Sequence, residues 1–253
     1  VEGSVDPIRD IEIINLELIM ADLQTVENRL GKVERKAQTN KDKDAVREVS
    51  VLKKLQEALL EGKAARSVEL DKEELAIVKA FSLLTLKPMI YVANMSDEEI
   101  MEPEANPYYQ AVKAHAEAEN NMVVPICAKI EEELSALDKE EKSEFLAELG
   151  IAESGLDQII KSAYHILNLR TFLTAGEDEC RAWTFKKGMK APECAGVIHT
   201  DFQKGFIRAE TYAFSDIDEL GSEHAVKEAG RLRLEGKDYE VQDGDVLHFR
   251  FNV

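Results

Sequence analysis

The chain has 253 residues, of which 44% are hydrophobic and 32% are charged, and its formal net charge is −18. This composition is that of a globular protein with room for two domains and a helical insertion. No apolar run approaches the roughly 20 residues of a membrane span, and no secretory signal pattern is present, so we expect a cytoplasmic protein without a membrane partner. Three cysteines without Cys-x-x-Cys spacing predict reduced thiols rather than a disulfide framework or a zinc site.

The first 60 residues predict a helical hairpin. Asp6 can cap the N–H groups of a helix that starts at Pro7. Apolar residues then alternate three and four positions apart, as in a coiled-coil seam: Leu16, Ile19, Leu23, Val26, Leu30 and Val33. A polar, lysine-rich break over residues 36–44 precedes a second periodic stretch, with Val49, Leu52, Leu55 and Leu59. We interpret the pair as an antiparallel hairpin, which is either an arm that contacts a large partner or a self-contained packing unit.

The following region predicts a parallel strand–helix–strand unit. The pattern favours an amphipathic helix over 69–84, buried strands over 87–94 and 122–128, and helices over 105–120, 130–149 and 155–167. Two such strands joined through a helix form a right-handed parallel crossover. Ligands of parallel sheets bind beyond the carboxyl ends of the strands, where Asn94, Cys127 and Ala128 fall.

The chain from Arg170 onward predicts a β-rich module. We expect strands over 170–175, 180–185, 206–213 and 246–251, a single helix over 225–235, and a hairpin turn at Asp243-Gly244. The predicted core is aromatic and consists of Trp183, Phe185, Phe202, Phe206, Phe249 and Phe251.

Negative charge is concentrated before this module. From Arg170 onward the chain has 12 Lys/Arg and 16 Asp/Glu, a net charge of −4, which leaves −14 for the first 169 residues. The module therefore repels the phosphates of an RNA partner less than the first 169 residues do. One hypothesis is an RNA or ribosome contact through Lys186, Lys187, Lys190 and Arg231, and the other is a solvated surface of mixed charge.

Residues 236–253, together with Arg181-Ala182-Trp183-Thr184 and residues 195–202, resemble the C-terminal TGS domain of the YchF or Obg-like ATPases, a branch of P-loop proteins related to translation factors. The resemblance extends forward to residues 1–7 and so covers essentially the whole chain. It implies an α/β fold: the C-terminal part of a P-loop nucleotide-binding domain with a coiled-coil helical insertion, followed by a ubiquitin-like β-grasp TGS domain. The implied boundaries are 1–15 and 85–169 for the nucleotide-binding (G-type) domain, 16–84 for the insertion and 170–253 for the TGS domain.

Two loops match the base-recognition elements of this class of proteins. Asn94-Met95-Ser96-Asp97 stands where related proteins carry Asn-Lys-x-Asp, whose Asp accepts two hydrogen bonds from guanine. Cys127-Ala128-Lys129 resembles their Ser-Ala-Lys loop, whose backbone N–H groups face the base. The resemblance therefore implies that nucleotide is bound by Asn94, Met95, Asp97, Cys127, Ala128 and Lys129. The alternative is that both segments are plain turns at strand ends.

The resemblance implies ATP as the nucleotide, with GTP as the alternative. YchF-like proteins pair an Asn-x-x-Glu variant with a preference for ATP; here Met95 replaces the Lys, whereas Asp97 restores the guanine-type acid. The sequence contains no Gly-x-x-x-x-Gly-Lys-[Ser/Thr] phosphate loop. We therefore expect that the intact protein has a portion upstream of Val1 that holds phosphates and Mg²⁺. We also expect no catalytic residue or metal ligand within this chain, which alone would be inactive.

The implied function is that of a ribosome-associated, YchF-like ATPase linked to translation or stress regulation, present here as a fragment. The alternative hypothesis is a non-enzymatic adaptor that binds RNA or the ribosome through the TGS domain and the helical arm.

Overall fold

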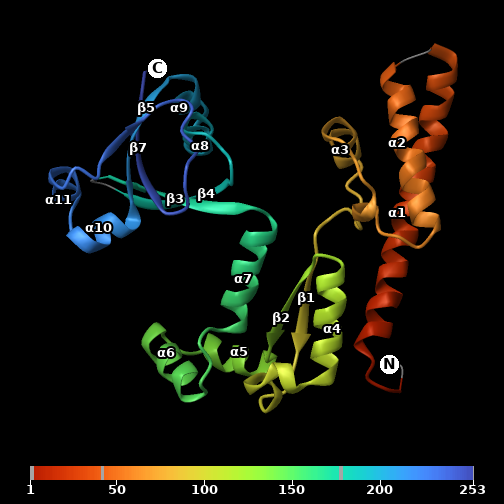
Figure 1. Cartoon of the computed structure of the whole chain (residues 1–253), viewed down its shortest axis with the longest axis horizontal. Helices are drawn as coiled ribbons and strands as arrows, with labels where there is room; N and C mark the ends of the chain where they lie inside the picture. The colour runs from red at the N-terminus through yellow and green to blue at the C-terminus, as the bar shows by residue number, and fades with distance from the viewer. Residues whose placement is uncertain (1–2, 41–42, 177–178, 253) are drawn as a thin grey trace. The chain divides into compact units, whose positions relative to one another are not determined.

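The structure is a computed structural model that describes residues 3–40, 43–176 and 179–252. The chain divides into two compact units, Val1–Ile160 and Lys161–Val253 (Figure 1). Each unit has a hydrophobic core of its own. Across these described ranges, no helix is both long and apolar enough to cross a bilayer.

The first unit combines two long helices with a small parallel sheet. Its elements are α1 (Pro7–Asn40), α2 (Lys43–Leu60), η1 (Ala65–Ser67), α3 (Lys72–Lys79), β1 (Ile90–Asn94), η2 (Glu99–Met101), η3 (Pro103–Ala105), α4 (Pro107–Ala118), β2 (Met122–Ile126), α5 (Ala128–Ser135) and α6 (Lys139–Glu148). A further helix, α7 (Gly155–Ile166), crosses into the second unit.

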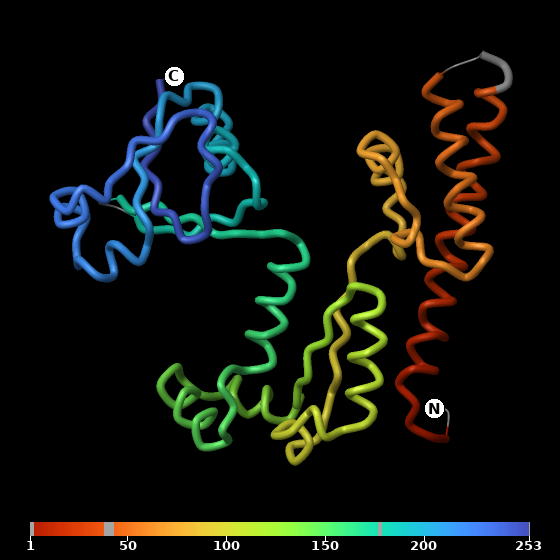
Figure 2. Tube along the Cα trace, in the orientation of Figure 1, coloured from red at the N-terminus to blue at the C-terminus, as the bar shows by residue number. Residues whose placement is uncertain are grey.

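The two long helices form an antiparallel hairpin, here called the helical arm (Figures 1 and 2). The Asp6 carboxylate accepts a hydrogen bond from the backbone N of Arg9 at 3.1 Å and so satisfies one N–H group of the first turn of α1. Ion pairs of Arg29 with Glu48 and of Lys53 with Glu34 join the two helices. The helices follow each other directly in the chain and pack side by side, so the chain reverses direction between them and the predicted hairpin is confirmed.

Most of the predicted seam is buried in the arm. The core of the arm contains Ile19, Val26, Leu30, Val51, Leu52, Leu55 and Leu59. Leu16 is an error in the prediction, because its side chain is 53% exposed where α1 extends beyond the end of α2. The predicted break over 36–44 is also too long, since α1 continues to Asn40 and α2 already begins at Lys43.

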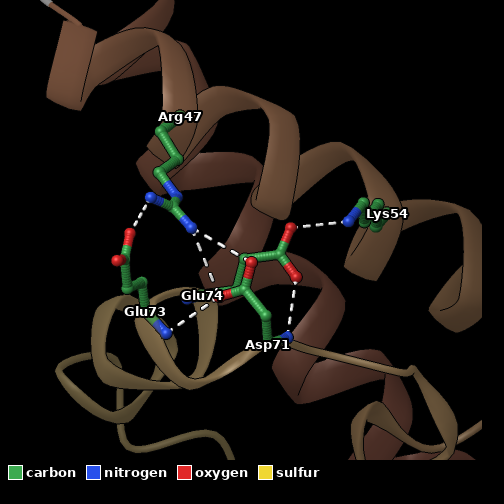
Figure 3. A network of polar contacts seen from close by, with 5 residues as sticks. All are labelled: Arg47, Lys54, Asp71, Glu73 and Glu74. Atoms are coloured by element: carbon green, nitrogen blue, oxygen red, sulfur yellow. Dashed lines mark hydrogen bonds and ion pairs between the residues drawn. The ribbon is translucent and has the colours of Figure 1, made fainter.

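Charged side chains tie the start of α3 to α2. The Asp71 carboxylate accepts hydrogen bonds from the backbone N of Glu73 and of Glu74, both at 2.8 Å, and Glu74 accepts one from Asp71 N at 3.0 Å. This reciprocal pattern is a capping box. From α2, Arg47 pairs with Asp71 and Glu73, and Lys54 pairs with Glu74 (Figure 3).

The buried carboxylate of Asp22 holds the segment that follows α3. It accepts hydrogen bonds from Leu84 N at 2.7 Å, from Thr85 N at 2.7 Å and from Thr85 Oγ1 at 2.6 Å, and only 2% of the residue is exposed. The helix predicted over 69–84 is therefore too long. It ends at Lys79. The chain leaves the helix through Ser82, whose φ of 53° is left-handed, and the N–H groups of Leu84 and Thr85 then donate to Asp22.

β1 and β2 pair in parallel, with Asn94 opposite Ile126, and α4 joins them. The predicted strand–helix–strand unit is thus confirmed. Asn106 caps α4, because its side chain accepts hydrogen bonds from two N–H groups of the first turn. The segment predicted to be helical over 130–149 forms two helices, because Asp138 caps a new helix there and divides the segment into α5 and α6.

The second unit is built around a five-stranded sheet. Its elements are β3 (Leu169–Ala175), β4 (Cys180–Lys186), α8 (Ala191–Ile198), α9 (Thr200–Lys204), β5 (Phe206–Ala213), α10 (Phe214–Leu220), α11 (Glu223–Glu228), β6 (Arg233–Glu235) and β7 (Asp245–Phe251). The strand order is β4-β3-β7-β5-β6, and only the β3–β7 pair is parallel. The first strand of the unit, β3, pairs with its last strand, β7, in the middle of the sheet. This is the predicted β-grasp arrangement.

Aromatic side chains fill the core between the sheet and α8. Phe172, Phe185, Phe206 and Phe249 are buried there with Cys194, as the strand pattern predicts for three of the four phenylalanines. Two of the other predicted core residues, Trp183 and Phe202, are half-buried against this cluster. Phe251 lies at the margin, 36% exposed, and stacks on Phe202 with 3.9 Å between ring centroids.

Two predictions for this unit are wrong. The single helix over 225–235 is replaced by α11, which ends at Glu228, and by β6, and the described residues also form α8, α9 and α10. Asp243-Gly244 does not close a hairpin. The Asp243 carboxylate instead accepts a hydrogen bond from Thr171 N of β3, and Gly244 N donates one to Thr171 O, both at 2.8 Å. The turn therefore positions the start of β7 beside β3.

Replacing Asp22 by Asn tests the buried carboxylate. We expect Asp22→Asn to lower the free energy of unfolding by about 2 kcal/mol, because an amide offers one acceptor oxygen and directs its NH₂ at backbone donors. Urea unfolding followed by the helical circular dichroism signal measures this change. The matched control is Asp10→Asn, because the Asp10 carboxylate pairs with Arg9 at the surface. This substitution should lower the free energy of unfolding by less than about 0.5 kcal/mol. Equal midpoints for the two variants would contradict a special role for Asp22.

Candidate functional site

The carboxyl ends of β1 and β2 lie side by side because the two strands are parallel and in register. Asn94, the last residue of β1, is opposite Ile126, the last residue of β2. The backbone N of Met95 then donates a hydrogen bond to Ile126 O at 2.8 Å, which keeps the following loops together. The two loops singled out from the sequence therefore meet at one edge.

Asn94 links the two loops through its side chain. Its Oδ1 accepts a hydrogen bond from the backbone N of Ala128 at 3.1 Å. Ala128 is the first residue of α5, and the preceding Cys127 gives no side-chain cap. Asn94 thus supplies, from another strand, the acceptor that a helix start requires.

Asp97 and Lys129 form an ion pair across the same edge. Lys129 Nζ lies 2.8 Å from Asp97 Oδ2, and the two side chains are 67% and 51% exposed, respectively. The hydrogen bond from Lys129 lowers the pKa of the Asp97 carboxyl, and the same contact raises the pKa of Lys129. Both groups are accessible and charged, so each can meet a polar ligand.

Met95 and Cys127 lie beneath this edge rather than on it. Met95 is 8% exposed and Cys127 is 4% exposed. The thiol side chain of Cys127 packs with Ile130 and Leu134 of α5. A ligand at the edge could reach Met95 and Cys127 only through backbone atoms.

A polar network behind the first loop was missed in the sequence. The Glu99 carboxylate accepts hydrogen bonds from Ser96 N at 3.1 Å, Ser96 Oγ at 2.8 Å and Asn106 Nδ2 at 2.8 Å. The bonds from Ser96 lower the pKa of Glu99. The Ser-x-x-Glu spacing of a capping box is the signal that could have revealed it. The network fixes the loop that carries Asp97.

A hollow of about 540 Å³ lies beside the first loop. Its lining includes Asn94 and Met95 together with Ile11, Tyr91 and Tyr109, but it includes neither Asp97 nor residues 127–129. The hollow and the exposed edge therefore share Asn94 and Met95 but are different surfaces.

In the second unit, two of the four cations predicted to contact RNA are neutralised. Lys190 Nζ lies 2.8 Å from Asp238, and Arg231 NH1 lies 2.9 Å from Asp216 and 2.7 Å from Glu219. Lys186 and Lys187 are exposed at the end of β4, and neither makes an ion pair within the described part of the chain. Of the four predicted cations, only Lys186 and Lys187 are therefore without a carboxylate partner in the described part of the chain.

The second unit matches a known protein family, and the whole chain matches known proteins. The family model YchF-GTPase_C, described as "Protein of unknown function (DUF933)", matches residues 169–252. The "Ribosome-binding ATPase YchF" of Bacillus subtilis is 58% identical over 253 residues, which are 100% of this chain and 69% of that protein. The chain belongs to the YchF and Obg-like ATPase family.

Other members of the YchF and Obg-like ATPase family match along the whole chain. "Obg-like ATPase 1" of Gallus gallus is 40% identical over 257 residues, covering 100% of this chain and 64% of that protein. The solved structure of the Schizosaccharomyces pombe YchF GTPase superimposes with a TM-score of 0.86 at 35% identity, over 99% of this chain and 68% of that one. The resemblance inferred from the sequence is therefore confirmed, as is the fold class.

Lys129→Met tests whether the ion pair controls Asp97. We expect the pKa of the Asp97 carboxyl to rise toward its ordinary value, because the hydrogen bond from Lys129 is the main cause of its lowering. Since the folded-state pKa is lowered, the stabilisation is present above the ordinary pKa of Asp and is lost as the pH falls. NMR titration of the carboxyl carbon measures the change, with Lys139→Met on α6 as the control. An unmoved titration in Lys129→Met would show that the contact does not persist in solution.

Proposed function

We propose that this chain supplies the base-recognition edge, the helical arm and the TGS domain of a ribosome-associated, YchF-like ATPase that acts in translation or stress regulation. The similarity to a protein named ribosome-binding ATPase supports this proposal. The observation that carries the nucleotide part is the meeting of two loops, in which Asn94 bonds Ala128 and Asp97 pairs with Lys129. Parallel sheets bind ligands at such carboxyl ends.

In this proposal residues 1–15 and 85–169 belong to the nucleotide-binding domain, residues 16–84 form the insertion, and residues 170–253 form the TGS domain. The β-grasp strand order and the family match over 169–252 support the last assignment. We place the protein in the cytoplasm, where ribosomes are met.

The preferred nucleotide in this proposal is ATP, with GTP as the alternative. To read guanine, the acid of the first loop would accept hydrogen bonds from the N1–H and the 2-amino group with its carboxylate oxygens. In this chain Asp97 Oδ2 already accepts a hydrogen bond from Lys129 at 2.8 Å. Met95, at the position of the usual Lys, is buried and places no charge over a base. Both features disfavour the guanine pattern.

Mg²⁺ and the phosphates would be held by other parts of a full-length relative. The sequence has no phosphate-loop motif, and the described residues include no group of three His, Cys, Asp or Glu suited to a metal ion. The residues present therefore do not fit Mg²⁺. Since phosphoryl transfer depends on positioning and charge stabilisation at the phosphates, we propose that this chain alone hydrolyses no ATP.

A non-enzymatic adaptor that binds RNA or the ribosome is the second candidate function. It is favoured by Lys186 and Lys187, which are exposed and unpaired within the residues that the structure describes. Lys190 and Arg231 contribute less to this hypothesis, because nearby carboxylates neutralise them.

Asp97→Ala tests base recognition in a protein of the relatives' full length that carries these residues. If the Asp97 carboxylate reads guanine donors despite its bond with Lys129, GTP affinity will fall about fivefold more than ATP affinity, which corresponds to one hydrogen bond of about 1 kcal/mol. Asn94→Ala should weaken both nucleotides, because the Asn94 amide holds the start of α5. Titrations with fluorescent ATP and GTP analogues measure both effects.

Equal losses of ATP and GTP affinity in Asp97→Ala would mean that the carboxylate only shapes its turn. The control is the 253-residue chain, which should show no Mg²⁺-dependent ATP hydrolysis; measurable turnover would overturn the proposed absence of catalysis.

Lys187→Glu tests the contact of the second unit with the ribosome. We expect weaker co-sedimentation with ribosomes and a salt dependence of binding that is shallower by about one unit of log–log slope, as for the loss of one phosphate contact. Lys227→Glu, at an exposed lysine on α11, is the matched control. Binding that is the same in both variants would remove Lys187 from the contact surface.

A further inference from the structure

The sheet of the second unit has one long edge strand, β4. Within the residues that the structure describes, β4 pairs only with β3, whereas the strand at the opposite edge, β6, has three residues. β4 has seven residues, from Cys180 to Lys186. Proteins usually keep exposed edge strands short or covered, because their unpaired backbone groups attract other strands. A long open edge in this unit therefore calls for a functional explanation.

The register of β4 on β3 identifies the backbone groups of the open edge. Gly176 N donates to Glu179 O at 3.0 Å, and Lys187 N donates to Asn168 O at 2.8 Å, at the two ends of the hairpin. Because only every second residue of an antiparallel strand bonds to a given neighbour, the odd-numbered residues of β4 bond to β3. The residues whose N–H and C=O groups face away from the sheet, here called the open-edge residues, are Cys180, Ala182 and Thr184.

The open-edge residues leave their backbone accessible. All three are exposed, and none has a side chain larger than that of threonine. The free edge stops at Lys186, whose N–H donates to Met189 Sδ at 3.3 Å. Residues two apart on a strand are about 6.8 Å apart. The edge therefore presents donors and acceptors at the repeat of an added strand.

Positive charge follows this edge. Residues 180–190 contain four Lys/Arg and no Asp/Glu, in a chain whose net charge is −18. The guanidinium of Arg181 lies over the Trp183 ring, 4.2 Å from its centroid, which orders the cation at the edge. Lys186 is exposed and makes no ion pair with any described residue. Successive side chains of a strand alternate between its faces, so Arg181 lies on one face of β4 and Lys186 on the other.

We propose that the open edge of β4 binds an extended acidic segment of a partner protein, which adds a strand to the sheet. Backbone hydrogen bonds to the open-edge residues would hold the segment, and Arg181 and Lys186 would select carboxylates on its two faces. Phosphates of RNA can also meet Lys186, but they offer no alternating N–H and C=O groups to the edge. The backbone row therefore favours a peptide. This inference goes beyond the proposed function, because it assigns the edge to a protein partner.

The probe is a fluorescent peptide of about eight residues of valine, threonine and glutamate, a typical strand length. Its binding to the 253-residue chain is measured by fluorescence anisotropy. We expect binding that is lost when lysine replaces glutamate, and lost when alternate peptide nitrogens are methylated in the frame that faces β4. Hydrogen exchange followed by NMR should slow at the amides of Ala182 and Thr184. The amides of Arg181 and Trp183, which face β3, should not change.

Ala182→Pro removes one outward N–H group and places a ring on the open side of β4. Proline is tolerated at an edge position whose N–H group is not used within the sheet, so the unfolding midpoint checks that the unit stays folded. We expect the affinity for the acidic peptide to fall at least about tenfold.

Arg181→Glu/Lys186→Glu tests the same edge without a proline and should also weaken binding at least about tenfold. The matched control is Lys227→Glu/Lys237→Glu, which reverses two exposed lysines elsewhere in the unit. Equal peptide affinities for these two variants would overturn the proposal, as would a wild-type chain that does not bind the peptide at about 1 mM. Binding that survives peptide methylation would also overturn it, in favour of a purely electrostatic contact such as one with RNA. Slower exchange at Ala182 and Thr184 with the acidic peptide, and not with the methylated one, would support it directly.

Discussion

The buried carboxylate of Asp22 is the constraint on which the first unit depends. A charge that is 2% exposed is stable only when its acceptor positions are filled. Here they are filled by the backbone N–H groups of Leu84 and Thr85 and by the Thr85 hydroxyl. The middle of α1 is thereby fixed to the segment that leads into β1. Two parts of the sequence more than 60 residues apart are joined by a contact that an apolar core could not specify as tightly.

From that anchor the geometry of the candidate site follows in two steps. The segment after Thr85 enters β1 at Ile90, and the parallel register with β2 places Asn94 opposite Ile126. The side chain of Asn94 then accepts the hydrogen bond from Ala128 that begins α5. A helix start and a strand end are therefore defined by one side chain. Base recognition, as proposed, would use a surface whose backbone is already ordered by hydrogen bonds, which reduces the entropy lost on binding.

The sequence predicts the parts of this structure that depend on local pattern. Seam spacing along α1 and the two apolar runs before Asn94 and Cys127 indicate the hairpin and the parallel strands. Element lengths depend on distant partners: the segment after α3 is not helical as far as Leu84, where the backbone N–H donates to Asp22 of α1. The motif singles out Asn94 and Asp97 as candidates, but it does not predict the pairing of Asp97 with Lys129, because a salt bridge between two loops depends on their relative position. The sequence does not predict that Asp216 and Glu219 neutralise Arg231, because this contact also depends on how the segments fold together.

The distribution of charge explains how an acidic chain could still meet RNA selectively. A net charge of −18 repels phosphate backbones over distances up to about the Debye length, roughly 8 Å at physiological salt. Non-specific association is then suppressed over most of the surface, and exposed lysines without a carboxylate partner are the positions that still attract phosphates. Within the described residues of the second unit, Lys186 and Lys187 lie together at the end of β4 without an ion pair, whereas Asp238 neutralises Lys190. A contact with phosphates there, as proposed, would be local and would weaken as the salt concentration rises.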